Sequence, residues 1–259
     1  MHRNIIIFTI AFVYFVLATY GLHIFETGLL GTSILLFGIP ALLLSHYTRA
    51  PSAVILSVTA VGVGLSILLE SIAHTFGLWY TLGENEVRLL GVVPLEMVIA
   101  FTLQIIFLAL VYEVLFDDGN YTLRNARDRV AMFVLFAVAA LALVLFHQLV
   151  LGNVFVEYSY LWIIGALIAS SLAMLMVHKA LSVQFLDRVI NFALFSSVPL
   201  GISLWLATEN AHKVFSSTEA YVSTVQFFGN TVPLEEMILL FAVPFFVATV
   251  YELYLDDQA

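Results

Sequence analysis

Glutamates embedded in apolar sequence are the residues of this chain best suited to chemistry. Glu96 follows Val93-Pro94-Leu95, and Glu235 follows Val232-Pro233-Leu234 at an offset of 139 residues. Glu236 stands beside Glu235, directly before a long apolar run. Two adjacent carboxyl groups in a medium of low dielectric constant rarely both ionise. One that stays neutral is a ready Brønsted acid, so this pair predicts acid–base catalysis.

Other polar residues recur at or near the same offset. Glu70 recurs as Glu209, and His74 recurs as His212 one residue short of the offset. The stretch Tyr112–Asp118, with Tyr-Glu at its start and Asp-Asp at its end, recurs as 251–257. Composition alone produces similar apolar segments but not matched Pro, Glu and His. The matches therefore predict a duplicated unit that sets two carboxylate-bearing half-sites against each other.

Each polar motif also has a structural interpretation. Pro94 and Pro233 suit the first turn of a helix, which would place Glu96 and Glu235 as caps near the positive end of the helix dipole. We favour a functional role, because a cap does not explain the second carboxyl group of Glu236. For Glu113 and Glu252, near the ends of the matched segments, we favour a solvated helix terminus.

Histidine and aromatic residues accompany the carboxylates. Glu70 and His74 are four residues apart and share one helix face, where they could exchange a proton, bind a metal or simply meet water. A metal site needs three or more ligands, and no HExxH motif is present, so we predict none. Trp79 and Tyr80 fit an interfacial aromatic belt, or a surface that attracts a carbocation through its ring faces.

The composition is that of an integral membrane protein. Of the 259 residues, 62% are hydrophobic and 10% charged, with a mean hydropathy of +1.05. Acidic residues outnumber basic ones 18 to 9, which argues against nucleic-acid binding. The acid excess with scarce lysine suits a high-salt, archaeal source. Cysteine is absent, and no dinucleotide fingerprint, P-loop or GxSxG motif is found, so we expect no cofactor.

The apolar runs predict an all-α, integral membrane helical bundle. Eight transmembrane helices are expected, at residues 4–22, 28–46, 53–73, 89–115, 130–150, 158–178, 189–207 and 229–254. They form two parallel four-helix repeats, 1–118 and 130–259, joined by a cytoplasmic linker at 119–129. Most basic residues fall on the side of the two termini, with Arg88 and Lys213 on the other. This bias predicts a multi-pass protein of the cell membrane with both termini cytoplasmic.

Several of these strings together resemble the lycopene cyclase domain, a small membrane-embedded family built from two similar halves. The resemblance rests on Gly77-Leu78-Trp79-Tyr80, on 91–96 (GVVPLE), on 101–104 (FTLQ) and on the family's Pro-x-Glu-Glu motif, present as 233–236. In the first half Met97 replaces the second glutamate. Glu70 stands where the family commonly has aspartate.

The resemblance implies a redox-neutral carotenoid cyclase of the isomerase type, whose substrate is a lipophilic isoprenoid dissolved in membrane lipid. A neutral carboxylic acid protonates a terminal double bond, a neighbouring alkene closes the ring, and a base removes a proton. Glu235 or Glu236 is the expected acid and Glu96 its partner base, with Glu70 and Glu209 in support. Other carotenoid-pathway enzymes are possible partners.

Three other functions fit the same residues. In a carotenoid hydratase, water held by His74 and His212 would capture the cation. In a proton-coupled carrier, Glu96 and Glu235 would be coupling sites and Pro244 would break the last helix. In a membrane adaptor, the carboxylates would serve only as caps.

Overall fold

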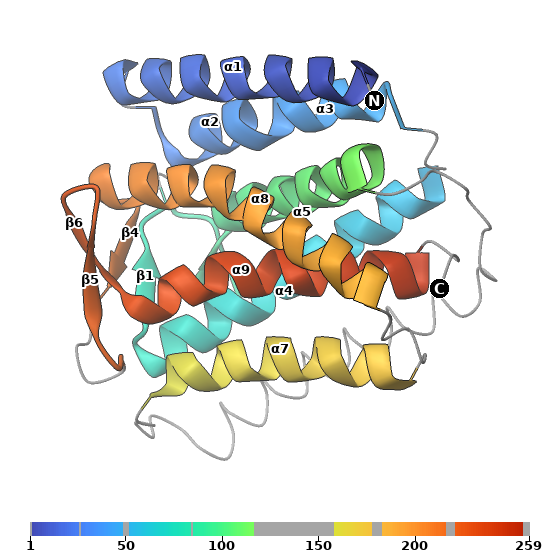
Figure 1. Ribbon diagram of the computed structural model, residues 1–259. Helices are drawn as coiled ribbons and strands as arrows, with labels where there is room; N and C mark the ends of the chain where they lie inside the picture. The colour runs from blue at the N-terminus through green and yellow to red at the C-terminus, as the bar shows by residue number, and fades with distance from the viewer. Residues whose placement is uncertain are drawn as a thin grey trace.

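The computed structural model describes residues 2–25, 27–48, 52–83, 85–116, 158–177, 183–215 and 221–255. Its helices lie side by side in one bundle (Figure 1). The α-helices are α1 (His2–Phe25), α2 (Leu29–Ser33), α3 (Ile39–Ser45), α4 (Ser52–Phe76), α5 (Leu95–Val111), α7 (Ser159–Val177), α8 (Val183–Glu209) and α9 (Leu234–Val250). The described residues also include the π-helical turns η1 (Ile34–Gly38), η2 (Tyr112–Phe116) and η4 (Tyr251–Leu255).

Five of these helical segments are long and apolar enough to cross a membrane: Val54–Phe76, Leu95–Phe116, Ser159–Met176, Val183–Glu209 and Leu234–Leu253. Large apolar side chains such as Leu56 and Trp162 are 70% and 72% exposed on the bundle surface, as expected for side chains that face lipid. The chain is therefore a helical membrane protein.

The other predicted spans have different outcomes. Those at 4–22 and 28–46 are helical, but their apolar parts, Val13–Phe25 and Leu29–Ser45, are shorter. The span at 130–150 and the linker at 119–129 lie outside the described residues. The total of eight spans and the arrangement in four-helix repeats remain predictions.

The second helical segment changes its hydrogen-bond spacing just before a proline. Its α-helical parts, α2 and α3, are separated by η1, and Pro40 occupies the first turn of α3. Proline has no N–H and its ring crowds the carbonyl four residues back. The wider π turn accommodates this defect without ending the helix.

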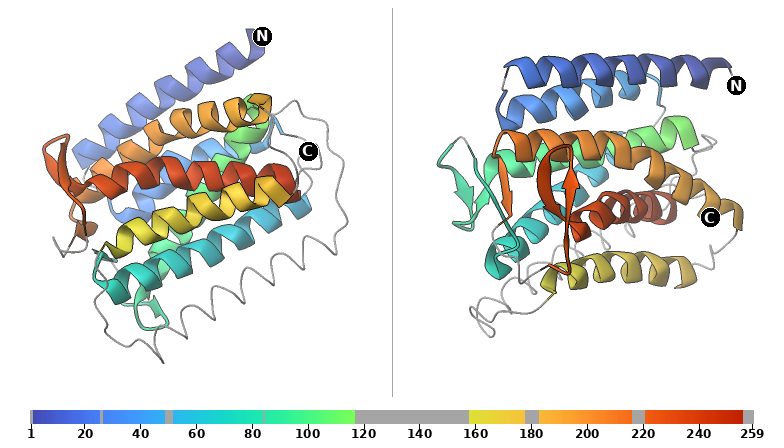
Figure 2. Two further views of the ribbon diagram at one scale, coloured as in Figure 1. Left: turned by 60° about the horizontal axis from the view of Figure 1, so that its bottom comes forward. Right: turned by 60° about the vertical axis from the view of Figure 1, so that its left-hand side comes forward.

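Short strands gather at one end of the bundle (Figures 1 and 2). β1 (Trp79–Thr81) pairs antiparallel with β4 (Lys213–Phe215), so that Tyr80 lies opposite Val214. β2 (Arg88–Leu89) pairs with β3 (Val93–Pro94), and β5 (Thr224–Phe227) pairs with β6 (Asn230–Pro233). The β1–β4 pair joins segments that are far apart in the sequence.

The fold is mostly helical, as predicted, but the hairpins change where two predicted helices begin. The spans expected at 89–115 and 229–254 begin inside hairpins, and their helices start only at Leu95 and Leu234. Pro94 and Pro233 end strands as N-cap residues with extended backbone, at φ −60°, ψ 132° and φ −59°, ψ 142°. They are therefore not in the first helical turn. The apolar residues of the hairpins run directly into those of the helices, which hides the boundary.

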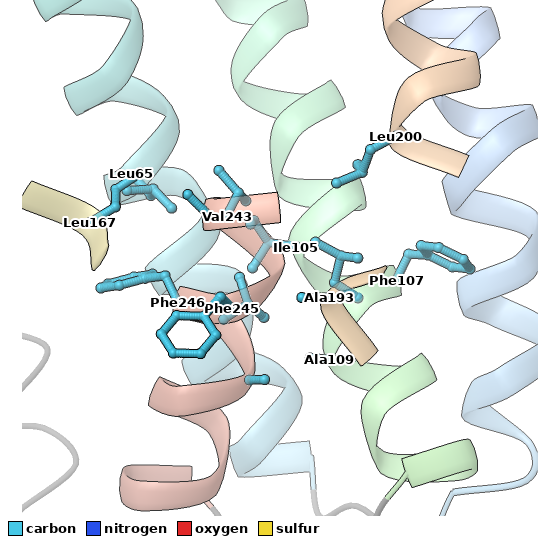
Figure 3. Close-up of a cluster of buried hydrophobic side chains, with 14 of the residues drawn as sticks. Leu65, Ile105, Phe107, Ala109, Leu167, Ala193, Leu200, Val243, Phe245 and Phe246 are labelled. Carbon is cyan, nitrogen blue, oxygen red and sulfur yellow. The ribbon is translucent and has the colours of Figure 1, made fainter. Parts of the chain in front are cut away.

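Helices α5 and α9 form the centre of the bundle. They have the same length and begin 139 residues apart, the offset of the sequence match, and each continues into a π turn. Figure 3 shows the apolar side chains packed between them and their neighbours, including Ile105, Val243 and Phe246. Helix α9 runs unbroken through Pro244, so this proline does not produce the broken helix considered for a carrier.

The two π turns are joined by a crossed pair of hydrogen bonds. Tyr112 Oη donates to Glu252 Oε2 at 2.9 Å, and Tyr251 Oη donates to Glu113 Oε2 at 2.7 Å. The two ring centroids are 5.9 Å apart. Glu113 and Glu252 are 5% and 2% exposed, so the expected solvated terminus is wrong. Arg188 Nη1 also lies 3.7 Å from Glu252 Oε1.

Helix α1 begins and η4 ends at the same end of the bundle, opposite the strands (Figures 1 and 2). Both termini on one side of a membrane require this arrangement. That both termini lie on one side of the membrane, and that this side is the cytoplasm, remain predictions from the basic residues.

We expect Tyr112→Phe and Tyr251→Phe each to lower the free energy of unfolding by about 1–2 kcal/mol, because each removes the donor to a buried carboxylate. The measurement is thermal unfolding in detergent. Tyr20→Phe is the matched control, because Tyr20 is 68% exposed. Equal midpoints for all three variants would show that the crossed bonds contribute nothing to stability.

Candidate functional site

A cavity of about 100 Å³ lies near the strand-bearing end of the bundle, among α4, α5, α8 and α9. Most of its wall is apolar, and Leu200 and Val243 belong both to this wall and to the apolar cluster in Figure 3. The polar residues that line it are Ser66, Glu70, Thr81, Gln104, Ser203, His212, Lys213 and Glu236. The cavity therefore combines carboxyl groups with a hydrocarbon-like surface.

The first carboxylate in the wall, Glu70, belongs to α4 and is 6% exposed. Trp79 Nε1 donates to its Oε1 at 2.9 Å, and Thr81 Oγ1 donates to its Oε2 at 3.0 Å. Both donors come from β1, which turns back against the end of α4 after Gly77 (φ +63°). An indole can only donate, whereas a hydroxyl can reverse. Glu70 can therefore be held either ionised or neutral.

The second carboxylate, Glu236, is 3% exposed. Lys213 Nζ lies 2.6 Å from its Oε1, and Tyr160 of α7 donates a hydrogen bond to its Oε2. The ammonium group of Lys213 also sits 4.3 Å from the ring centroid of Trp79. Such a contact attracts the cation electrostatically. The two donors hold Glu236 as a carboxylate.

These two carboxylates belong to one network. The pairing of β1 with β4 places Thr81 opposite Lys213, so one strand supplies the donors to Glu70 and the other supplies the cation for Glu236. Trp79 connects the two parts, because its N–H bonds Glu70 and its ring lies beside Lys213. Glu70 also interacts electrostatically with Lys213 and Glu236.

Glu96 and Glu235 are placed differently from the prediction. The backbone N–H of Asn85 donates to Glu96 Oε1 at 2.9 Å, with its side-chain amide on the same oxygen. The backbone N–H of Val222 donates to Glu235 Oε1. Both carboxylates thus fold back on the loop that precedes their helix and do not line the cavity. They lie in the first turns of α5 and α9 and bind the loops that precede these helices.

The loop over Glu96 depends on a glycine. A Cβ atom at Gly83 would lie 2.9 Å from Glu96 Oε2 and 3.0 Å from Pro94 Cβ. Any larger residue would have to displace one of them. Glu235 Oε2, by contrast, is buried without a hydrogen-bond partner among the described residues.

The remaining predicted residues are divided between the cavity and its surroundings. Glu209 is exposed and accepts a hydrogen bond from Asn230 at 3.1 Å, outside the cavity. His212 lines the cavity, with its Nε2 3.4 Å from the carbonyl oxygen of Thr27. His74 packs edge-on against Tyr80, with ring centroids 5.2 Å apart, away from this cavity. Within the described ranges, no three His, Asp or Glu residues are grouped to hold a metal ion.

Sequence reasoning missed Lys213, Tyr160 and Thr81. Lys213 carried a signal, because lysine occurs at only two positions in the chain and this one follows His212 directly. Tyr160 carried no such signal, because nothing in the sequence relates α7 to Glu236. Thr81 follows the Trp79-Tyr80 motif, and only the strand geometry shows that it reaches Glu70.

Comparisons with known proteins found no relative. No protein-family model matches the chain, and neither the curated proteins nor the solved structures gave a match.

We expect Glu96→Ala to lower the free energy of unfolding by about 1–3 kcal/mol, because two donors of Asn85 lose their acceptor. Glu209→Ala is the matched control and should change it by less than about 0.5 kcal/mol, because Glu209 is exposed. Thermal unfolding in detergent compares the two. Similar midpoints would mean that the bonds from Asn85 to Glu96 do not stabilise the protein.

We expect Lys213→Met to cost about 3–5 kcal/mol of stability, because it leaves the buried Glu236 carboxylate without its cation. The double variant Lys213→Met, Glu236→Leu should recover most of that loss. A double-mutant cycle on unfolding midpoints measures the coupling. Additive losses would show that the two groups do not depend on each other.

Proposed function

We propose that this chain is a membrane enzyme that protonates a carbon–carbon double bond of a linear isoprenoid and closes a ring, as a carotenoid cyclase does. The observation that carries the proposal is the pair of buried carboxylates, Glu70 and Glu236, on the wall of one largely apolar cavity between spanning helices. Ionisable groups in such surroundings are costly and usually functional. Glu236 also belongs to the Pro-x-Glu-Glu motif on which the family resemblance rests.

The hydrogen bonds suggest which carboxyl group is the acid. Glu236 is held ionised by Lys213 and Tyr160, whereas the Thr81 hydroxyl can reverse and accept a hydrogen bond from neutral Glu70. We therefore assign proton donation to Glu70. A C–H bond forms at the terminal alkene, and a tertiary carbocation results.

Ring closure and proton loss complete the sequence. The neighbouring alkene supplies the electron pair for the new C–C bond, and the positive charge moves into the ring. The Glu236 carboxylate stabilises this charge and removes a proton, so no net oxidation occurs.

The size of the cavity sets a limit on the substrate. A space of about 100 Å³ holds only a small hydrocarbon fragment. We therefore propose that the reacting end of the polyene enters, while the rest of the molecule lies between the helices and in lipid.

A hydratase is the second candidate, and His212 favours it. This side chain lines the cavity together with Glu70 and could orient a water molecule toward the cation. The first step is the same in both reactions. The products differ, because hydration adds the mass of one water molecule and cyclisation adds none.

The test is co-expression with a lycopene-producing pathway in a bacterium, followed by chromatography and mass spectrometry of the pigments. A cyclic carotene of unchanged mass is expected for the wild type. Glu70→Gln and Glu236→Gln should each reduce product formation at least about 100-fold, the usual contribution of a positioned acid or base.

Glu235→Gln and Glu96→Gln are matched controls, since these carboxylates bond loops outside the cavity. Both should retain activity within a few-fold, at comparable protein levels. A hydrated product would select the hydratase. Unchanged lycopene in cells with the wild-type protein would overturn the carotenoid proposal and would favour the carrier.

A further inference from the structure

A second cavity shares a wall with the first one. It has a volume of about 270 Å³, and we call it the vestibule. Glu70, Trp79 and Thr81 line both spaces. The vestibule is otherwise lined by His74, Tyr80, Leu82, Arg88, Gly91 and Val92. Glu70 therefore stands at the boundary between two cavities.

The vestibule belongs to the end of the bundle and the first cavity to its interior. Apart from Glu70 and His74, its lining residues lie in the segment between the candidate spans Val54–Phe76 and Leu95–Phe116. Leu82 is 50% exposed and Tyr80 is 38% exposed. Arg88 Nη1 donates to the carbonyl oxygen of Val92 at 2.9 Å, which fixes the turn at the rim. This rim can meet water.

The opposite direction offers no comparable route in the described part of the chain. Beyond the first cavity lies the apolar cluster of Figure 3, with Ile105, Val243 and Phe246. A smaller space between α4, α5 and α9 has only apolar side chains and Tyr251 on its wall. Protons cross such a layer poorly because it offers no chain of hydrogen bonds.

We infer that the vestibule is the aqueous route by which Glu70 regains its proton. The chemical role rests on the proposed function, in which each turnover leaves Glu70 ionised and Glu236 protonated. One proton must then be taken up at Glu70 and one released from Glu236, with no net change. The inference of water access does not depend on that function. Thr81 reaches both cavities and bonds Glu70 Oε2 at 3.0 Å. Its hydroxyl gives a proton to Glu70 and takes one from vestibule water. His74 also lines the vestibule, where its imidazole ring can hydrogen-bond that water.

The absence of cysteine allows a direct test of water access. Thr81→Cys places a thiol at the shared wall, and Val243→Cys places one in the first cavity alone. A small, charged, membrane-impermeant methanethiosulfonate should label the first at least 10-fold faster than the second. Both thiols should react fully after denaturation. Equal rates, or no labelling of the Thr81 variant in the native state, would overturn the inference.

A second pair of variants tests the proton role. Val92→Cys lies in the vestibule, and Val87→Cys lies in the same loop outside it and is 56% exposed. The reagent should label both, but only modification at position 92 should lower pigment cyclisation by about 10-fold or more. If modification lowered cyclisation at neither position, the proton role would be overturned. An inactive wild type with the expected labelling would instead overturn the proposed function and leave the aqueous route standing.

Discussion

The need of every buried carboxylate for a hydrogen-bond donor governs this structure. A carboxylate without a partner inside an apolar bundle costs several kcal/mol, and among the described residues six glutamates are less than 9% exposed. The backbone N–H groups of a helix beyond its first turn cannot supply those donors, because they bond within the helix. Loops, strands and tyrosines supply them: Asn85 for Glu96, β1 for Glu70, and the crossed tyrosines for Glu113 and Glu252.

The apolar parts of the fold could be predicted from sequence because hydropathy and length decide them. The helices near 53–73, 158–178 and 189–207 lie close to where the apolar runs placed them. The hairpins were not predicted, because their valines and phenylalanines extend the apolar run of the next helix. The π turn before Pro40 follows from the missing N–H and the ring of this proline. Hydropathy alone does not reveal it.

The candidate site was predicted in its residue types but not in its pairing. Glu70, Glu236, Trp79 and His212 line the cavity, whereas the matched pair Glu96 and Glu235 does not. Sequence symmetry suggested that equivalent residues meet. The structure instead brings together non-equivalent ones, because β1 pairs with β4 and places Lys213 beside Glu236. A long-range strand pair of three residues has no signal in local composition.

The β1–β4 pair also bears on the order in which the protein is made. Thr81 lies in the first third of the chain, and Lys213 emerges only after α8. A nascent chain that ends before β4 has Glu70 with its donors but neither the lysine nor Glu236. The two-carboxylate cavity therefore forms late in synthesis, after most of the bundle has been made.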